Sequence, residues 1–449
     1  MNEPAHTPAP TAAVASWIWL GAYALIAAGV LAVLLGLSRT PVLHDLIPGT
    51  QWFRVALVAH VDLSVLVWFV AGAGTLWTLY LGPRHRTITA VSLLLALIGT
   101  VLISSAPFIG AERPLMANYV PVLQHPWFYA GLLAIGAALA TQACSFLVTF
   151  MRNPRDGNVT VRLALALAAA SALLALLGVG MSWLRMPEGV LDERYFELLF
   201  WGGGHVLQFM HTILMLVAAT LLLRAAGGRL PGSELMQCSL FALCALPLLG
   251  VPWLLTLEPG SAGYIIGYSE LMRWGGTGCI PLLLLVATGM RRAPSAADLG
   301  AQTLYSALWW SLLLFAAGGI LGFLIRGSNT VIPAHYHGSI VGVTLAYMGV
   351  FYLLLPRLGF PLTMARTARW QPVVYGIGQV MHIAGLAWTG GHGAQRKMVG
   401  TAEGMSRAQE IVGMGLMGMG SLVAVIGGVM FLLVVLVSVG RARRHRSSD

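Results

Sequence analysis

Two histidines stand one residue apart at the start of a long apolar stretch, in the sequence Ala334-His335-Tyr336-His337. Residues i and i+2 of an α-helix lie about 200° apart around its axis, at roughly 100° per residue. The two imidazoles therefore point to opposite sides of one helix. Burying two histidines in a membrane without a function would be costly. The spacing suits a helix that lies between two hemes and gives an axial ligand to each.

Two further histidines match this pair in depth. His60 lies early in the second predicted membrane segment and His205 early in the sixth, while His335 and His337 lie early in the tenth. Even-numbered segments all begin on the same side, which the charge pattern below makes the outer side. One buried histidine is more often a packing residue, but four at matched depth indicate metal ligands.

The composition is that of a helical membrane protein. Of 449 residues, 57% are hydrophobic and 9% are charged, and the mean hydropathy is +0.79. In lipid, each long apolar run satisfies its own backbone hydrogen bonds as a helix. We predict an all-α, polytopic fold with a single transmembrane domain over residues 1–449, in which the first helix is retained. The twelve predicted spans lie near residues 14–37, 53–81, 88–111, 126–150, 160–183, 198–223, 234–256, 262–290, 304–326, 331–355, 372–391 and 411–440.

The charge pattern predicts an orientation in the membrane. The net charge is +10, and 16 of the 26 basic residues lie in loops after even-numbered spans or in the C-terminal tail. By the positive-inside rule, both termini are cytoplasmic in a bacterial-type inner membrane, with residues 1–13 and the basic residues 441–449 as tails. Membrane lipid is the expected surrounding. Charges spread over short loops argue against nucleic-acid binding.

The four histidines stand in stretches that resemble subunit I of the heme-copper oxidase superfamily, which includes cytochrome c oxidase and the bacterial nitric-oxide reductases. Residues 334–337 look like the family's Ala-His-Phe-His on helix 10, and residues 60–63 (His-Val-Asp-Leu) are similar to its His-Thr-Asn-Leu on helix 2. Residues 201–206 (Trp-Gly-Gly-Gly-His-Val) resemble the entry to helix 6. Residues 379–390 and 395–397 resemble the end of helix 11 and its basic pair. The likeness covers nearly the whole chain, because that subunit also has twelve helices.

The resemblance implies two hemes of b- or o-type. His60 and His337 would be the two axial ligands of a low-spin heme, which transfers electrons and binds no substrate. His335 would be the sole protein ligand of a high-spin heme, whose far face is open to O2 or NO.

Four residues near the end of helix 11 have open roles. Arg396 and Lys397 would hold the heme propionates or are ordinary loop charges. His382 and His392 would hydrogen-bond propionates or lie at the membrane interface.

The resemblance also implies a second metal, and here the sequence departs from it. In the family, His205 would be one of three histidine ligands, and the other two form an adjacent pair farther along the chain. No histidine occurs between His211 and His335. His211 lies about 240° around the helix from His205 and does not restore the site. Phe209 stands where the A-type oxidases carry a cross-linked tyrosine. The copper site is expected to be defective or absent.

Proton pumping is not expected either. Lys397 is the only lysine, so the proton-channel lysine of the A-type oxidases has no counterpart. Glu270 and Arg273 are interpreted as a pair at the membrane boundary and not as part of a channel.

We therefore predict a diheme membrane protein of respiratory electron transfer, able to bind a diatomic gas at one heme. The alternatives are an active terminal oxidase or nitric-oxide reductase, and a twelve-helix transporter. The four cysteines form no CxxC or CxxCH, so the chain itself attaches no c-type heme. Electrons are expected from a small subunit, a cytochrome c or a cupredoxin on the outer face.

Overall fold

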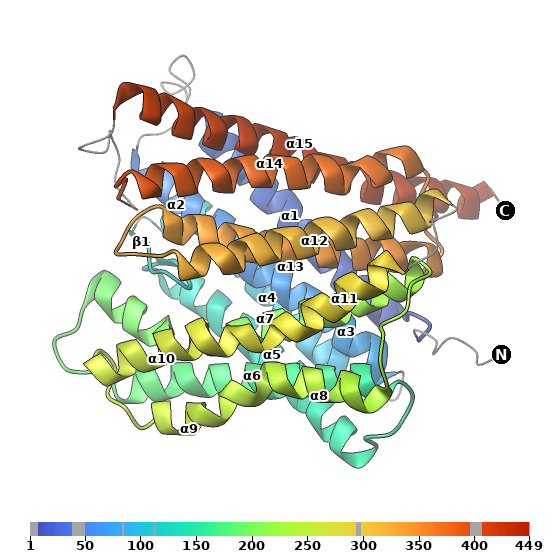
Figure 1. The fold of residues 1–449 in the computed structure, drawn as a ribbon, viewed down its shortest axis with the longest axis horizontal. Coiled ribbons are helices and arrows are strands. Elements are labelled where there is room, and N and C mark those ends of the chain that lie inside the picture. Colours follow the sequence, from blue (N-terminus) through green and yellow to red (C-terminus); the bar gives the residue numbers. More distant parts are fainter. Residues whose placement is uncertain are drawn as a thin grey trace. The chain divides into compact units, whose positions relative to one another are not determined.

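The computed structural model describes residues 8–37, 50–82, 85–111, 113–292, 298–395 and 406–448. Over these residues, helices cover all twelve predicted spans, and the one sheet is the short antiparallel pair β1 (Pro114–Leu115) and β2 (Val122–Leu123). The predicted all-α fold is confirmed (Figure 1). The uninterrupted spans are α1 (Ala12–Leu37), α4 (Arg86–Ser105), α5 (Pro126–Arg152), α6 (Val159–Leu184), α7 (Asp192–Ala225), α12 (Leu299–Phe323), α13 (Val331–Arg357), α14 (Ala365–Gly391) and α15 (Arg407–Ser448).

Three predicted spans are helical but interrupted. One break contains Pro247, which lacks a backbone N–H, and another contains Gly276, whose backbone is flexible. Both features favour a tighter helical turn. The third break is a π-helical turn directly after His60, of a kind often found at functional sites. The segments are α2 (Thr50–Val61), η2 (Asp62–Val67) and α3 (Trp68–Leu81); α8 (Glu234–Ala245), η5 (Leu246–Gly250) and α9 (Val251–Leu254); and α10 (Ala262–Gly275), η6 (Gly276–Cys279) and α11 (Ile280–Arg291).

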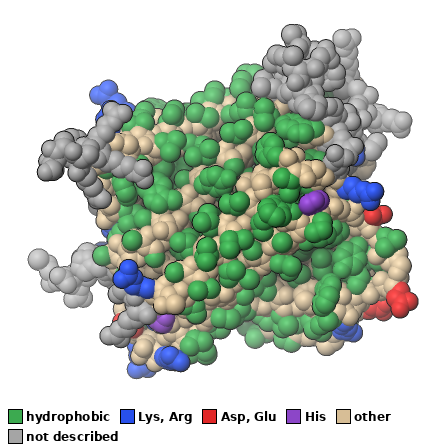
Figure 2. All heavy atoms as spheres, turned by 180° about the vertical axis from the view of Figure 1, so that it is seen from behind, with side chains coloured by type: hydrophobic (Ala, Val, Ile, Leu, Met, Phe, Trp, Pro, Cys, Tyr) green, Lys and Arg blue, Asp and Glu red, His purple; other side chains and the backbone are tan. Residues whose placement is uncertain are grey.

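The helices have the length and polarity of membrane spans. Within the described residues, eleven of the twelve are long and apolar enough to cross a membrane. The twelfth, α14, has 27 residues but carries more polar side chains, among them Gln371 and His382. Large apolar side chains such as Leu133 and Leu249 point outward, at 75% and 78% exposure. Figure 2 shows one such face, covered by hydrophobic side chains with the charged ones at its edges.

The first of two compact units comprises residues 1–217 and 232–282. In it, α1 packs on α3, α4 on α5, α5 on α6, and α6 on α8. Hydrogen bonds from buried side chains join these helices: the Trp77 indole donates to the Leu165 carbonyl at 3.0 Å, and the Ser92 hydroxyl donates to the Ala138 carbonyl at 2.8 Å. These bonds hold α3 against α6 and α4 against α5.

The second unit comprises residues 218–231 and 283–449. Here α12, α13 and α14 pack on one another, and α15 lies along α14. Two glycines let α12 and α13 approach closely, because a Cβ on Gly338 would lie 2.7 Å from the Cα of Gly318. The Ser311 hydroxyl donates to the Gly342 carbonyl at 2.6 Å along the same seam. Small residues at such a seam are typical of helix packing in membranes.

Candidate functional site

His335 is held against the neighbouring helix of the second unit. Its Nδ1 lies 2.7 Å from the carbonyl oxygen of Gly318 on α12. A carbonyl oxygen only accepts, so Nδ1 carries the proton and Nε2 carries the lone pair. Gly322, one turn farther along α12, makes room for the ring, because a Cβ there would lie 2.8 Å from the same Nδ1. The backbone therefore orients His335 and presents Nε2 as a metal-ligating nitrogen.

His337 has the same tautomer as His335, but its hydrogen-bond acceptor lies in its own helix. Its Nδ1 donates to the carbonyl oxygen of Pro333 in its own helix, at 2.8 Å. The ring stacks on Tyr336, with centroids 5.0 Å apart, and meets His382 of α14, with centroids 4.9 Å apart. The hydrogen bond to Pro333 and the ring contacts with Tyr336 and His382 thus restrain His337.

His60 lies at the end of α2 in the first unit. Its Nδ1 lies 2.8 Å from the Ala28 carbonyl on α1, so its lone pair is again on Nε2. Two residues later, Asp62 opens the π-helical turn and is buried at 1% exposure, with no hydrogen bond to Oδ2 within the described part of the chain. His60 is half-buried, and its Nε2 is the ring nitrogen left for a metal.

His205 lies on α7 among aromatic rings. Its Nδ1 donates to the Trp201 carbonyl at 2.6 Å. Ring centroids of Trp201, Tyr119 and Tyr268 lie 4.8, 4.9 and 6.2 Å from its own. Indole and phenol side chains do not supply the nitrogen ligands that copper prefers. In the ranges that the structure covers, no three His, Cys, Asp or Glu side chains come together as a metal site. The residues around His205 do not fit a three-histidine copper site.

The glycine run before His205 serves close packing. A Cβ on Gly202 would lie 2.8 Å from the Tyr268 ring, and one on Gly203 would lie 2.7 Å from the Ala175 carbonyl. A Cβ on Gly204 would overlap the Tyr119 ring. Each glycine therefore admits a different neighbour: α10 at Gly202, α6 at Gly203 and the loop that carries Tyr119 at Gly204.

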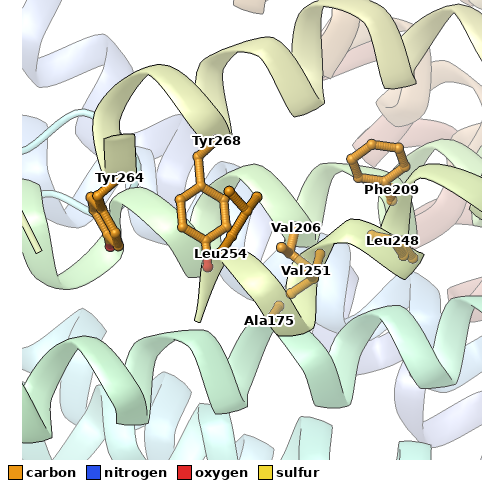
Figure 3. Close-up of a cluster of buried hydrophobic side chains, with 8 residues drawn as sticks. All are labelled: Ala175, Val206, Phe209, Leu248, Val251, Leu254, Tyr264 and Tyr268. Atoms are coloured by element: carbon orange, nitrogen blue, oxygen red, sulfur yellow. The ribbon is translucent and has the colours of Figure 1, made fainter. Parts of the chain in front are cut away.

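Two tyrosines on one face of α10 complete this region. The Tyr264 hydroxyl donates to the Leu198 carbonyl at 3.0 Å and accepts from the Gly202 amide at 3.1 Å, and it lies 2.8 Å from the Ser182 hydroxyl. Figure 3 shows Tyr264 and Tyr268 as part of a cluster of buried hydrophobic side chains. The cluster consists of Ala175, Val206, Phe209, Leu248, Val251, Leu254, Tyr264 and Tyr268.

Phe209 belongs to this apolar cluster and is buried at 3% exposure. A Cβ on Gly275 would lie 3.0 Å from its ring, which shows how closely α10 packs there. The phenyl ring therefore has a packing role at the position where the sequence resemblance would have a tyrosine.

Tyr119 comes from the loop between α4 and α5. Its hydroxyl accepts a hydrogen bond from the Gln208 amide at 3.3 Å. Burial raises the pKa of the Tyr119 phenol above its ordinary range, so the hydroxyl stays protonated at neutral pH. No local sequence pattern links this loop residue to His205, so sequence reasoning missed it. The i, i+4 spacing of Tyr264 and Tyr268 was the available signal for α10.

The remaining candidates divide between the site and the surface. His382 contacts His337, whereas His392 is half-buried directly after the end of α14 and donates from Nδ1 to the Trp388 carbonyl at 2.8 Å. Arg396 and Lys397, the predicted propionate-binding pair, lie outside the described residues.

Two further sequence predictions concern the first unit. His211 packs edge-on against Phe69, with centroids 4.7 Å apart, and its Nδ1 has no hydrogen-bond partner within the described ranges. The predicted pairing of Glu270 and Arg273 is confirmed, with Oε1 and Nη1 3.0 Å apart. Glu270 also accepts from the Trp274 indole at 2.7 Å, so this carboxylate is satisfied locally.

Comparisons with known proteins found a matching family, related sequences and a related structure. A sequence model of the family described as "Cytochrome C and Quinol oxidase polypeptide I" matches residues 12–430. "Uncharacterized protein RP382" of Rickettsia prowazekii (strain Madrid E) is 29% identical, over 93% of this chain and 94% of its own length. An "Uncharacterized protein" of Aquifex aeolicus (strain VF5) is 29% identical, over 79% of this chain and 88% of its own.

A solved structure of a heme-copper terminal oxidase dimer has the same fold. It matches with a TM-score of 0.71 at 16% identity, over 96% of this chain and 82% of that chain.

Proposed function

Because the chain belongs to the cytochrome c and quinol oxidase polypeptide I family, we propose that it is a diheme membrane cytochrome of respiratory electron transfer that lacks a complete copper site. The family implies heme as the cofactor. The observation that carries the proposal is the contrast between two environments. His60, His335 and His337, like His205, each donate Nδ1–H to a backbone carbonyl and offer Nε2, but the neighbours of His205 are the rings of Trp201, Tyr119 and Tyr268, which give copper no further imidazole ligand.

We assign the low-spin heme to His60 and His337. Nδ1 of each imidazole donates to a backbone carbonyl and leaves Nε2 for a metal, and their sequence contexts resemble the family's ligand positions on helices 2 and 10. A heme held by both residues would supply electron transfer. The Nδ1–H bonds orient the two rings and increase their basicity as ligands.

We assign the high-spin heme to His335. Its Nδ1–H bond to Gly318 and the space left by Gly322 fit a single, firmly oriented ligand. The opposite side of that heme would be open to O2 or NO. By the resemblance, His205 would supply one nitrogen ligand to a second metal, which is too few to hold copper by itself. Reduction of O2 in one fast step needs a nearby electron-donating metal, so we propose reversible gas binding or electron transfer instead. Arg396 and Lys397 are proposed to bind propionates.

The surroundings of the protein follow from its surface and charge. It is a multi-pass membrane protein in contact with lipid. We propose the bacterial inner membrane with both termini on the cytoplasmic side, because basic residues are concentrated in the loops after even-numbered spans. The electron donor is proposed to be a small subunit, a cytochrome c or a cupredoxin on the outer face. Proton pumping is not part of the proposal, since Lys397 is the only lysine.

An optical spectrum of the purified protein tests the proposal. Reduced minus oxidised spectra should show heme, and addition of CO should change about half of the heme absorbance, because only the heme on His335 has an open position. A spectrum in which all heme binds CO would contradict the low-spin assignment. A protein without heme would favour the transporter alternative.

A further inference from the structure

His382 of α14 lies against His337 of α13. The ring centroids are 4.9 Å apart and the ring planes are tilted by 53°. His382 therefore contacts an imidazole that we assign to iron, although sequence reasoning gave it only a propionate or interface role. The two helices belong to one compact unit.

His382 is itself anchored by α15. Its Nδ1 lies 2.8 Å from the Ser421 hydroxyl and 3.1 Å from the Met417 carbonyl. Ser421 donates its own proton to the Met417 carbonyl at 2.8 Å, so it accepts from His382. One Nδ1–H is thus shared between two acceptors on the same helical turn. This arrangement fixes both the tautomer and the ring orientation of His382.

The approach of α15 to His382 depends on glycines. A Cβ on Gly420 would overlap the backbone nitrogen of His382, and a Cβ on Gly378 would overlap that of Ala424. A Cβ on Gly385 would lie 2.6 Å from the Gly413 carbonyl. The glycines recur at intervals of seven residues on each helix, which keeps them on one face. Without a close approach, the Ser421 hydroxyl would not reach the imidazole.

We propose that His382, held by Ser421, is a positioning residue that sets the ring orientation of His337. The proposal rests on the assignment of His337 as a heme ligand. The Nδ1–H bond to Pro333 restrains one edge of the His337 ring, and contact with His382 restrains its tilt. Outer contacts of this kind orient metal-ligating histidines and tune the metal.

Electron paramagnetic resonance of the oxidised protein tests the proposal, because the g values of a low-spin ferric heme depend on the angle between its two axial imidazole planes. His382→Ala removes the imidazole ring. Ser421→Ala keeps the ring but removes one of its two hydrogen-bond acceptors. Both variants should shift the largest low-spin g value and the midpoint potential at unchanged heme content. The shift should be larger for His382→Ala. Ser421→Thr retains the hydroxyl and should restore the wild-type signal.

His392→Ala is the matched control. It removes a half-buried imidazole directly after the end of the same helix, which bonds the Trp388 carbonyl, and it should leave the signal unchanged. Wild-type g values and potential in both His382→Ala and Ser421→Ala, with full heme content, would overturn the positioning role. Loss of the low-spin heme in His382→Ala but not in His337→Ala would also overturn it, since His382 would then be the ligand.

Absence of a low-spin heme from the wild-type protein would instead refute the proposed function. If His382→Ala does not fold, the Ser421→Ala and Ser421→Thr pair decides.

Discussion

The Nδ1 atom of His335 lies 2.7 Å from the carbonyl oxygen of Gly318, on the neighbouring helix α12. This bond joins a candidate iron ligand to the seam at which α12 and α13 approach most closely. The packing of two helices therefore decides which nitrogen of His335 is available for a metal.

Gly322→Ala should disturb the heme assigned to His335. The new methyl group would lie 2.8 Å from Nδ1, so either the imidazole or the helix must move. We expect a lower fraction of CO-reactive heme, measured by the CO difference spectrum. The control is Gly319→Ala on the same helix, where an added Cβ meets nothing within 4 Å. Equal CO binding in both variants would contradict a steric role of Gly322.

His337→Ala should remove the low-spin heme and leave the CO-binding heme. The substitution removes one of two axial ligands from the first heme but leaves His335 in place. Optical and electron paramagnetic resonance spectra of the variant measure the two hemes separately. Loss of CO binding with an intact low-spin signal would show that the two assignments are exchanged.

Arg162→Met should destabilise the first unit. Arg162 is buried at 5% exposure and donates to the Tyr80 and Asn153 carbonyls, both at 3.2 Å, near the C-terminal ends of α3 and α5. A cation stabilises such helix ends, and the loss of hydrogen bonds from a charged group costs about 2 kcal/mol.

The thermal unfolding midpoint in detergent measures this effect. Arg185→Met is the control, because exposed Arg185 also donates to a carbonyl, that of Leu255 at 2.9 Å. Its midpoint should change little. An equal decrease in both variants would argue against the importance of the buried position of Arg162.

Gly204→Ala should loosen the aromatic surroundings of His205. Its Cβ would overlap the Tyr119 ring, and overpacking of this kind costs about 1–3 kcal/mol. We expect a lower unfolding midpoint at unchanged iron content, because His205 is not assigned to heme. Gly180→Ala on α6 is the control, since nothing lies within 4 Å of a Cβ there. A loss of iron in Gly204→Ala would show that the region around His205 contributes to heme binding.

The spans could be predicted because hydropathy and length decide them residue by residue. Even the more polar α14 was found, since its apolar residues still form a long run between charged loops. The break near Pro247 follows from proline chemistry, whereas the π-helical turn after His60 has no comparable sequence signal.

The candidate ligands could also be predicted, but their partners could not. The carbonyl that accepts from His60 comes from Ala28, 32 residues earlier, and that for His335 comes from Gly318, 17 residues earlier. Backbone carbonyls are the same in every residue type, so only the fold identifies these acceptors. For the same reason, contact between His382 and His337 required the structure.

The ratio of iron to copper in the purified protein tests the central claim most directly. We predict two heme irons per chain and no stoichiometric copper, because His205 is surrounded by Trp201, Tyr119 and Tyr268 and not by other imidazoles. One copper per chain, together with rapid consumption of O2, would contradict the account and identify an active terminal oxidase.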